Sequence, residues 1–163
     1  MADPASRPGP VNGNGNGAAA TAPSPASVRI QRRVEWSDTD SSGAWHNTAA
    51  FRFMEAAETS LLERLGFVAD VYGRHPRVHL EADFVRPLWF HDLVDIEIEV
   101  TKVGRSSVTY RVEIRRGEEI CVTGKLVTVL LDRIGGTPQP WPETYRRKLL
   151  AAGAQRPELI VEG

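Results

Sequence analysis

The sequence has one cysteine, a nearly balanced charge and no long apolar run, and each shortage excludes a class of protein. Cys121 has no second cysteine to pair with, so an internal disulfide is excluded and a reducing cytoplasm is the expected location. The formal net charge of -1 gives no electrostatic reason to expect nucleic acid or an anionic membrane as a partner. No apolar stretch is long enough to span a bilayer, so we expect no membrane association.

The first 26 residues also lack large apolar side chains. They are mainly Ala, Pro, Gly, Ser and Asn, a composition that buries too little surface to offset the entropy lost on ordering. They have neither the basic start nor the apolar core of a signal peptide. We therefore predict a disordered N-terminal tail over residues 1–26, one domain over residues 27–153 and a C-terminal tail over residues 154–163.

Order is expected from Val28 onward, where apolar residues alternate with polar ones. Alternation of this kind is typical of a half-buried strand, and its apolar positions are Val28, Ile30, Val34 and Trp36. The spacing then changes to three and four residues, which predicts a helix from about Asn47 to Leu65. Its apolar stripe consists of Ala50, Met54, Ala57, Leu61 and Leu65. Asn47 or Thr48 can cap the start of this helix, and Gly66 fits its end.

Four more alternating runs predict four consecutive strands. Their apolar faces are Val78, Leu80, Ala82 and Phe84; Val94, Ile96, Ile98 and Val100; Val108, Tyr110, Val112 and Ile114; and Ile120, Val122, Leu126 and Leu130. Short turn-rich links at residues 102–105 and 116–117 make the last three strands antiparallel neighbours. One long helix followed by strands predicts an α+β fold, an antiparallel sheet curled around that helix. Cys121 is expected to be a small strand residue, and residues 142–151 a last, outer helix.

The turn before the long helix is the most informative segment. It places Asp38 and Asp40 between the end of a strand and the start of the helix. A carboxylate facing a helix N-terminus can attack or activate water, and the helix end can stabilise an oxyanion. The alternative is an Asx-turn that only ends the strand.

The motif and the layout together resemble the hotdog-fold acyl-CoA thioesterases of the 4-hydroxybenzoyl-CoA thioesterase type. The resemblance rests on residues 34–43 (VEWSDTDSSG), 51–55 (FRFME) and 86–92 (RPLWFHD), and it covers roughly residues 29–132. It implies a hotdog fold, hydrolysis of acyl-CoA or acyl-carrier-protein thioesters, and two protomers that pair to build their sites at the interface. It implies no metal and no cofactor, because CoA or phosphopantetheine is part of the substrate.

The same resemblance implies roles for individual residues. Asp40 is the expected catalytic carboxylate, as nucleophile or as base for water, and the N–H of Asn47 is the expected oxyanion donor. Gly43 and His46 are expected to bind substrate beside them. Arg105 and Ser106 are expected to bind the phosphates of CoA, since the fork of arginine suits phosphate.

Departures from the family pattern leave alternatives open. Relatives often carry Tyr-His at the helix start, where this chain has His46-Asn47, so His46 is either a participant or a capping residue. Glu55 is expected to support the helix surface, and Arg105 is equally consistent with an exposed turn. The alternative function is a hotdog module that binds acyl-CoA or an acyl carrier without turnover; a dehydratase is a weaker third. We expect a homodimer that pairs its sheets edge to edge, and the sequence leaves a homotetramer open.

Overall fold

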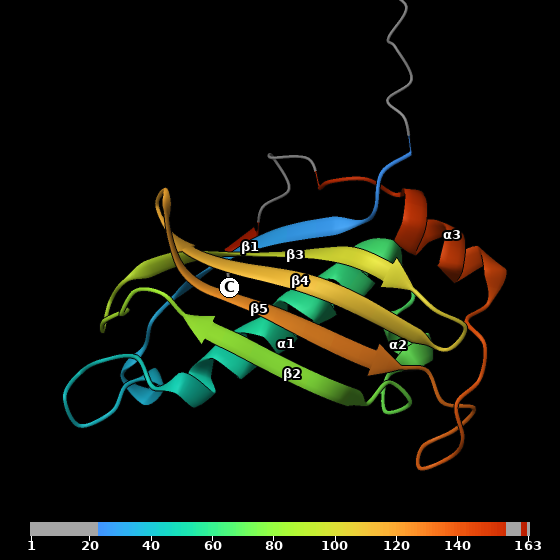
Figure 1. Cartoon of the computed structure of the whole chain (residues 1–163), viewed down its shortest axis with the longest axis horizontal. Coiled ribbons are helices and arrows are strands. Elements are labelled where there is room, and N and C mark those ends of the chain that lie inside the picture. The colour runs from blue at the N-terminus through green and yellow to red at the C-terminus, as the bar shows by residue number, and fades with distance from the viewer. Residues whose placement is uncertain (1–22, 156–160, 163) are drawn as a thin grey trace, which may run out of the picture.

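A curved sheet wraps around one long helix in the computed structural model, which describes residues 23–155 and 161–162 (Figure 1). The strands lie in the order β2-β5-β4-β3-β1-β6, and all neighbours are antiparallel except β1 and β6. Their bounds are β1 (Ser27–Arg33), β2 (Arg77–Phe84), β3 (Leu93–Val103), β4 (Ser107–Arg116), β5 (Glu119–Val129) and β6 (Val161–Glu162). The predicted α+β layout is therefore confirmed.

The central helix is α1 (Asn47–Leu65), with the bounds that its apolar spacing predicts. All five residues of the predicted stripe are buried against the sheet. Gly66 ends the helix in the left-handed region with a φ of 78°, a conformation that glycine adopts without a steric penalty. The expected cap at Asn47 or Thr48 is wrong: His46 is the N-cap, and its side chain accepts a hydrogen bond from the Thr48 N–H.

The inner face of the sheet forms the core with α1. The predicted inward residues of β3 and β4 are almost completely buried, and so are Val122, Leu126 and Leu130 in and after β5, whereas Ile120 is half-buried. Gly124 stands in this face beside Met54 of α1 and the backbone of Glu81, where a Cβ atom would collide with both. The missing side chain thus lets the helix approach the sheet closely.

The edge strand β2 departs from the prediction. Val78, Leu80 and Phe84 were expected on a buried face, but they are 60%, 39% and 50% exposed. The strand pairs only with β5 among the described residues, and a bulge between Arg77 and His79 shifts its register. Apolar side chains of β2 therefore extend beyond the helix at an open edge of the sheet, a position that alternation alone does not reveal.

A short 3₁₀ helix, η1 (Trp36–Asp38), interrupts the first predicted strand. It forms because the Asp38 carboxylate accepts the N–H of Glu35 and turns the chain after β1. Trp36 is consequently 72% exposed, with its ring edge-on to Phe90, and does not continue the buried face that the alternation predicts.

Two further helices close the end of the barrel-like sheet opposite the start of α1. They are α2 (Val68–Val71) and α3 (Glu143–Ala151), and α3 confirms the last predicted helix. Lys148 of α3 donates to the carbonyl of Leu65, which fixes α3 at the C-terminal end of α1. Of the predicted C-terminal tail, Val161–Glu162 pairs with β1; residues 1–22 of the predicted N-terminal tail lie outside the described residues. No helix in the described ranges is both long enough and apolar enough to cross a membrane.

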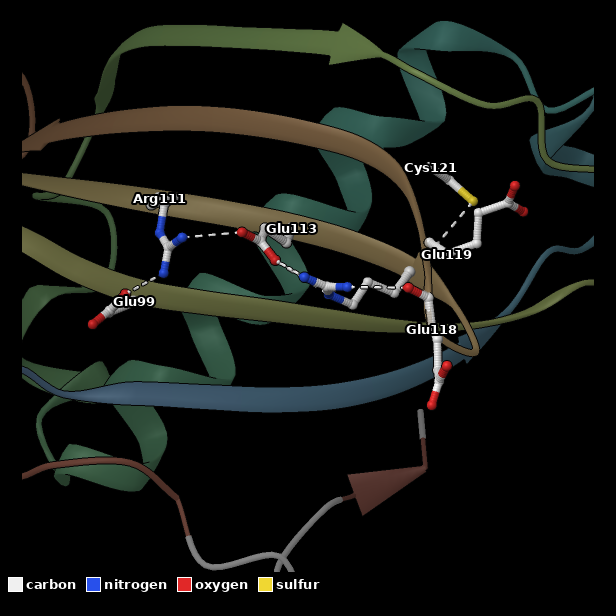
Figure 2. Close-up of polar contacts among 7 residues, drawn as sticks. Glu99, Arg111, Glu113, Glu118, Glu119 and Cys121 are labelled. Carbon is white, nitrogen blue, oxygen red and sulfur yellow. Dashed lines mark hydrogen bonds and ion pairs between the residues drawn. The ribbon is translucent and has the colours of Figure 1, made fainter.

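The outer face of the sheet is charged, and its charges pair with one another (Figure 2). Arg111 donates to Glu99 at 2.7 Å and to Glu113 at 3.0 Å, and Arg115 donates to Glu113 at 2.6 Å. Such exposed pairs add little stability, about 0–1 kcal/mol each. These paired charges lie on a solvated surface and largely neutralise one another.

Candidate active site

Asp40 lies in the tight turn that joins η1 to α1. Its Oδ1 accepts two hydrogen bonds from Ser42, from the hydroxyl at 2.6 Å and from the backbone N–H at 2.8 Å. These bonds hold the pKa of the Asp40 carboxyl below its ordinary value. Oδ2 makes no hydrogen bond or ion pair with any described residue. One oxygen is therefore held in place, and the other is available for chemistry.

Asp38, two residues earlier, is a structural carboxylate. It is buried, and its two oxygens bind the Glu35 N–H at 3.0 Å and the Arg52 guanidinium at 2.5 Å. Its backbone carbonyl also accepts the N–H of His46 at 2.7 Å. Asp38 thus anchors the turn to the first turns of α1 and has no oxygen left for a substrate.

The start of α1 presents an unused backbone donor. His46 Nδ1 accepts the Thr48 N–H at 3.2 Å, and the Ala49 N–H donates to the His46 carbonyl at 2.9 Å. The N–H of Asn47, between them, has no acceptor among the described residues, as expected for the first turn of a helix. Because Nδ1 accepts, a neutral His46 carries its proton on Nε2. Asn47 N–H and His46 Nε2–H are therefore donors next to Asp40.

These groups meet in one cleft with a volume of about 470 Å³. Asp40, His46 and Asn47 form its polar side, and the chain from Phe84 to Leu88 forms the opposite wall. Trp45 lies between, with its ring edge-on to Phe53 and Phe84. A carboxylate, an unbonded backbone N–H and an aromatic wall therefore share one concave site, an arrangement that can serve acyl transfer.

The other predicted substrate residues lie apart from this cleft within one protomer. Gly43 adjoins it and adopts a φ of 79°, which the turn requires. Arg105 and Ser106 belong to the β3–β4 turn, where their carbonyls accept the N–H groups of Trp141 and Leu130 at the α3 end of the sheet. The structure of one chain thus brings Asp40, His46 and Asn47 together and leaves Arg105 and Ser106 at the opposite end.

Two other candidates are accounted for by their contacts. Glu55 is exposed and pairs with Arg77 at 2.7 Å, which supports the expected surface role. Cys121 is buried, and this burial raises the pKa of its thiol, so it is a small strand residue and a poor nucleophile.

A second cavity, of about 290 Å³, lies between α1, α2 and the start of β2. Its polar group comprises Glu58, His75 and Arg77, which we call the Glu58 cluster. Glu58 Oε1 lies 3.1 Å from His75 Nδ1, and Glu58 Oε2 lies 2.5 Å from Arg77. Glu58 and His75 are 1% and 6% exposed, and His75 Nε2 and Arg77 Nε have no hydrogen-bond partner among the described residues.

Sequence reasoning missed this cluster, although one signal for it exists. Glu58 is four residues after Met54 and three before Leu61, so it lies on the buried stripe of α1 and needs partners there. The partners, His75 and Arg77, come from the loop before β2 and from its first residue. Across the residues that the structure describes, no group of three or more His, Cys, Asp or Glu side chains is placed to hold a metal ion.

Comparison with known proteins places the chain among thioesterases. The model of the thioesterase superfamily matches residues 42–123, half of the chain. A 1,4-dihydroxy-2-naphthoyl-CoA hydrolase of Prochlorococcus marinus (strain NATL2A) is 29% identical over 104 residues, which cover 56% of this chain and 67% of that protein. One from Synechococcus elongatus is 23% identical over 124 residues, which cover 72% and 91%.

Solved structures of thioesterases resemble this chain as well. A thioesterase from Thermus thermophilus, complexed with coenzyme A and zinc, is 27% identical with a TM-score of 0.68, covering 74% of this chain and 90% of that one. A probable thioesterase from Bartonella henselae is 25% identical with a TM-score of 0.65, covering 70% and 98%. These neighbours have the hotdog fold, so the predicted fold is confirmed.

Proposed function

The chain belongs to the thioesterase superfamily, and on that basis we propose that it hydrolyses acyl-CoA thioesters in the cleft at the start of α1. The observation that supports this site is the pairing of a free Asp40 oxygen with the unbonded N–H of Asn47 in one cleft. A protein that only binds acyl-CoA has no need for a carboxylate beside an anionic substrate. Hydrolysis therefore explains Asp40 better than binding without turnover does.

The reaction requires little from the protein, because a thioester is already activated. The substrate carbonyl accepts the Asn47 N–H, which stabilises the oxyanion as it develops. Asp40 Oδ2 attacks the carbonyl carbon, the carbon–sulfur bond breaks, and CoA leaves as its thiolate; water then hydrolyses the mixed anhydride. Attack by water with Asp40 as base is the alternative. The lowered pKa of Asp40, caused by Ser42, keeps the carboxylate ionised, as both routes require.

We further propose a hydroxylated aromatic acyl group as the substrate class. The relatives named above are called 1,4-dihydroxy-2-naphthoyl-CoA hydrolases, and the cleft has Trp45 and Phe84 in its wall. Aromatic side chains suit a flat ring because they pack against it edge-on or offset. CoA is the proposed carrier, an acyl carrier protein is the alternative, and no further cofactor is required. The lone cysteine agrees with a reducing cytoplasm.

The proposed active form is a C2 dimer that pairs two β2 strands antiparallel. The open edge of β2 and its exposed Leu80 and Phe84 support this pairing. An antiparallel pair places the α3 end of one subunit beside the cleft of the other. Arg105, remote from Asp40 in its own chain, would then approach the partner's Asp40 and could bind the phosphates of CoA.

Hydrolysis across a panel of acyl-CoAs tests the function, with Asp40→Asn as the decisive variant. Asparagine keeps the shape but loses the charge, so we expect about a 100- to 10,000-fold loss of kcat with the fold intact. Asp38→Asn is the matched control and should retain most of its turnover. Equal turnover by the wild type and Asp40→Asn would refute the site.

A further inference from the structure

The Glu58 cluster contains buried polar atoms that have no hydrogen-bond partner among the described residues. His75 Nδ1 and Glu58 Oε1 are 3.1 Å apart, and since a carboxylate can only accept, the tautomer that suits this contact has its proton on Nδ1. In that tautomer Nε2 is an acceptor, while Arg77 Nε is a donor, and neither has a hydrogen-bond partner among the described residues. Glu58 Oε2 has no hydrogen-bond partner there either, although it lies 2.5 Å from Arg77 as an ion pair. Buried polar atoms without partners are rare and costly, so a missing partner is the economical explanation.

The missing partner matches a hydroxyl group. A hydroxyl can donate to His75 Nε2 and accept from Arg77 Nε at the same time. A carboxylate suits the cavity poorly, since Glu55 and Glu58 already bring two negative charges to the single cation of Arg77. The remaining lining is largely apolar and includes Leu62, Val68 and Val71. This combination fits a hydroxyl carried on an apolar ring.

The position of the cluster links it to the active site of a second subunit. The cavity includes Pro76 and Arg77 at the start of β2, and the cleft includes Phe84 and Val85 at its end. About 23 Å separate the two ends of an eight-residue strand, so one protomer keeps them apart. In an antiparallel pair of β2 strands, the start of each strand faces the end of the other. The cavity of one subunit then lies near the cleft of its partner.

We propose that the Glu58 cluster of one subunit binds the ring hydroxyl of the aromatic acyl group whose thioester lies at the Asp40 of its partner. The inference rests on the proposed function and deepens it, because it assigns substrate selectivity to His75, with Glu58 fixing the orientation of its ring. His75 is a specificity-determining residue here and takes no part in bond cleavage. Each site is incomplete without the second copy.

Paired substrates test the selectivity. The probes are 1,4-dihydroxy-2-naphthoyl-CoA and 2-naphthoyl-CoA, which differ only in the ring hydroxyls. We expect His75→Phe to lower kcat/KM for the dihydroxy substrate by about 10-fold or more, as loss of a buried hydrogen bond predicts, and to leave the other substrate within about two-fold. His75→Asn should give an intermediate loss. Leu150→Phe, a substitution on the exposed side of α3 that lines neither cavity, is the control and should change neither rate.

Equal losses on both substrates, or no loss on either, would overturn the inference while leaving the proposed function intact. A wild-type chain that hydrolyses neither substrate nor any other acyl-CoA would overturn the proposed function and the inference with it. Circular dichroism of each variant separates a failure to fold from a change in selectivity.

Subunit mixing tests the shared site directly. Asp40→Asn and His75→Phe chains are unfolded together and refolded as a mixture, so that half of the dimers are mixed. If the two residues serve a site from different subunits, each mixed dimer has one intact site, and activity on the dihydroxy substrate recovers to about a quarter of the wild-type value. Activity no higher than the mean of the two separate variants would refute a shared site.

Discussion

At the scale of single residues, the two aspartates of the turn differ through their contacts and not through their chemistry. Asp38 is buried and has both oxygens bound, whereas Asp40 is exposed and has one oxygen free. The sequence motif predicts that the pair is important, and the family resemblance favours Asp40. The hydrogen bonds that separate the roles involve Glu35, Arg52 and Ser42, and no spacing rule predicts them.

We predict that Ser42 sets the acidic limit of activity. Its hydroxyl bond is the largest cause of the lowered pKa of Asp40, since it stabilises the ionised carboxylate. Ser42→Ala removes this bond and raises the pKa of Asp40 toward its ordinary value. Because the proposed mechanism needs the ionised carboxylate, the acidic limb of the kcat/KM profile should move to higher pH. Ser41→Ala, which removes an exposed hydroxyl without such a bond, should leave the profile unchanged, and identical profiles for all three proteins would contradict the assignment.

Arg105 is expected to act on binding alone. A phosphate clamp contacts the ground state and the transition state equally, so Arg105→Ala should raise KM for acyl-CoA with little change in kcat. The loss should be smaller for an acyl-pantetheine thioester, which lacks the nucleotide. Steady-state kinetics on both substrates provide the measurement. A penalty of equal size on the two would show that Arg105 does not contact the nucleotide part.

At the scale of elements, the periodicity of apolar residues predicts the helices and strands that bury one face. The bounds of α1 and the inward faces of β3 and β4 follow from it, because both are packed against the core along their whole length. The same pattern fails for β2 and Trp36. Strand β2 lies at an open edge of the sheet, so its alternating apolar residues are not covered. Trp36 lies in a turn that the hydrogen bond from the Glu35 N–H to Asp38 imposes. Which strand lies at the edge depends on strand order, and strand order is a property of the whole sheet.

Gly124 controls how closely α1 packs on the sheet. A Cβ there would lie 2.8 Å from the Glu81 carbonyl oxygen and would also collide with Met54 Cε. Met54 can rotate, but the carbonyl cannot move unless β2 shifts. Gly124→Ala should therefore lower the free energy of unfolding by about 1–3 kcal/mol, measured by urea denaturation. Thr123→Ala, on the next residue of β5, should cost about 0.5 kcal/mol or less, so equal values would argue against a steric origin.

At the scale of the whole molecule, the groups proposed to act on the substrate are spread over both ends of the sheet. The nearness of Asp40 and Asn47 in one cleft could be predicted because a short motif contains both. The Glu58 cluster could not, because its members come from α1 and from a segment 17 residues or more further on. Tertiary packing alone brings them together. In the proposed dimer the two ends meet, because the start of one β2 strand faces the end of its partner.

A charge on β2 tests whether two subunits pair through this strand. Leu80→Glu places a charge on the exposed apolar face of β2 and should prevent two edges from pairing, because burial of an unpaired carboxylate is costly. Light scattering of the full-length chain should change from a dimeric to a monomeric mass, while circular dichroism remains native. Activity should fall with the dimer, since each site then loses its neighbour. Leu150→Glu, on α3 with a similar exposure of 42% against 39%, is the matched control and should remain dimeric and active. A monomeric Leu80→Glu protein with full activity would show that one chain suffices for the reaction.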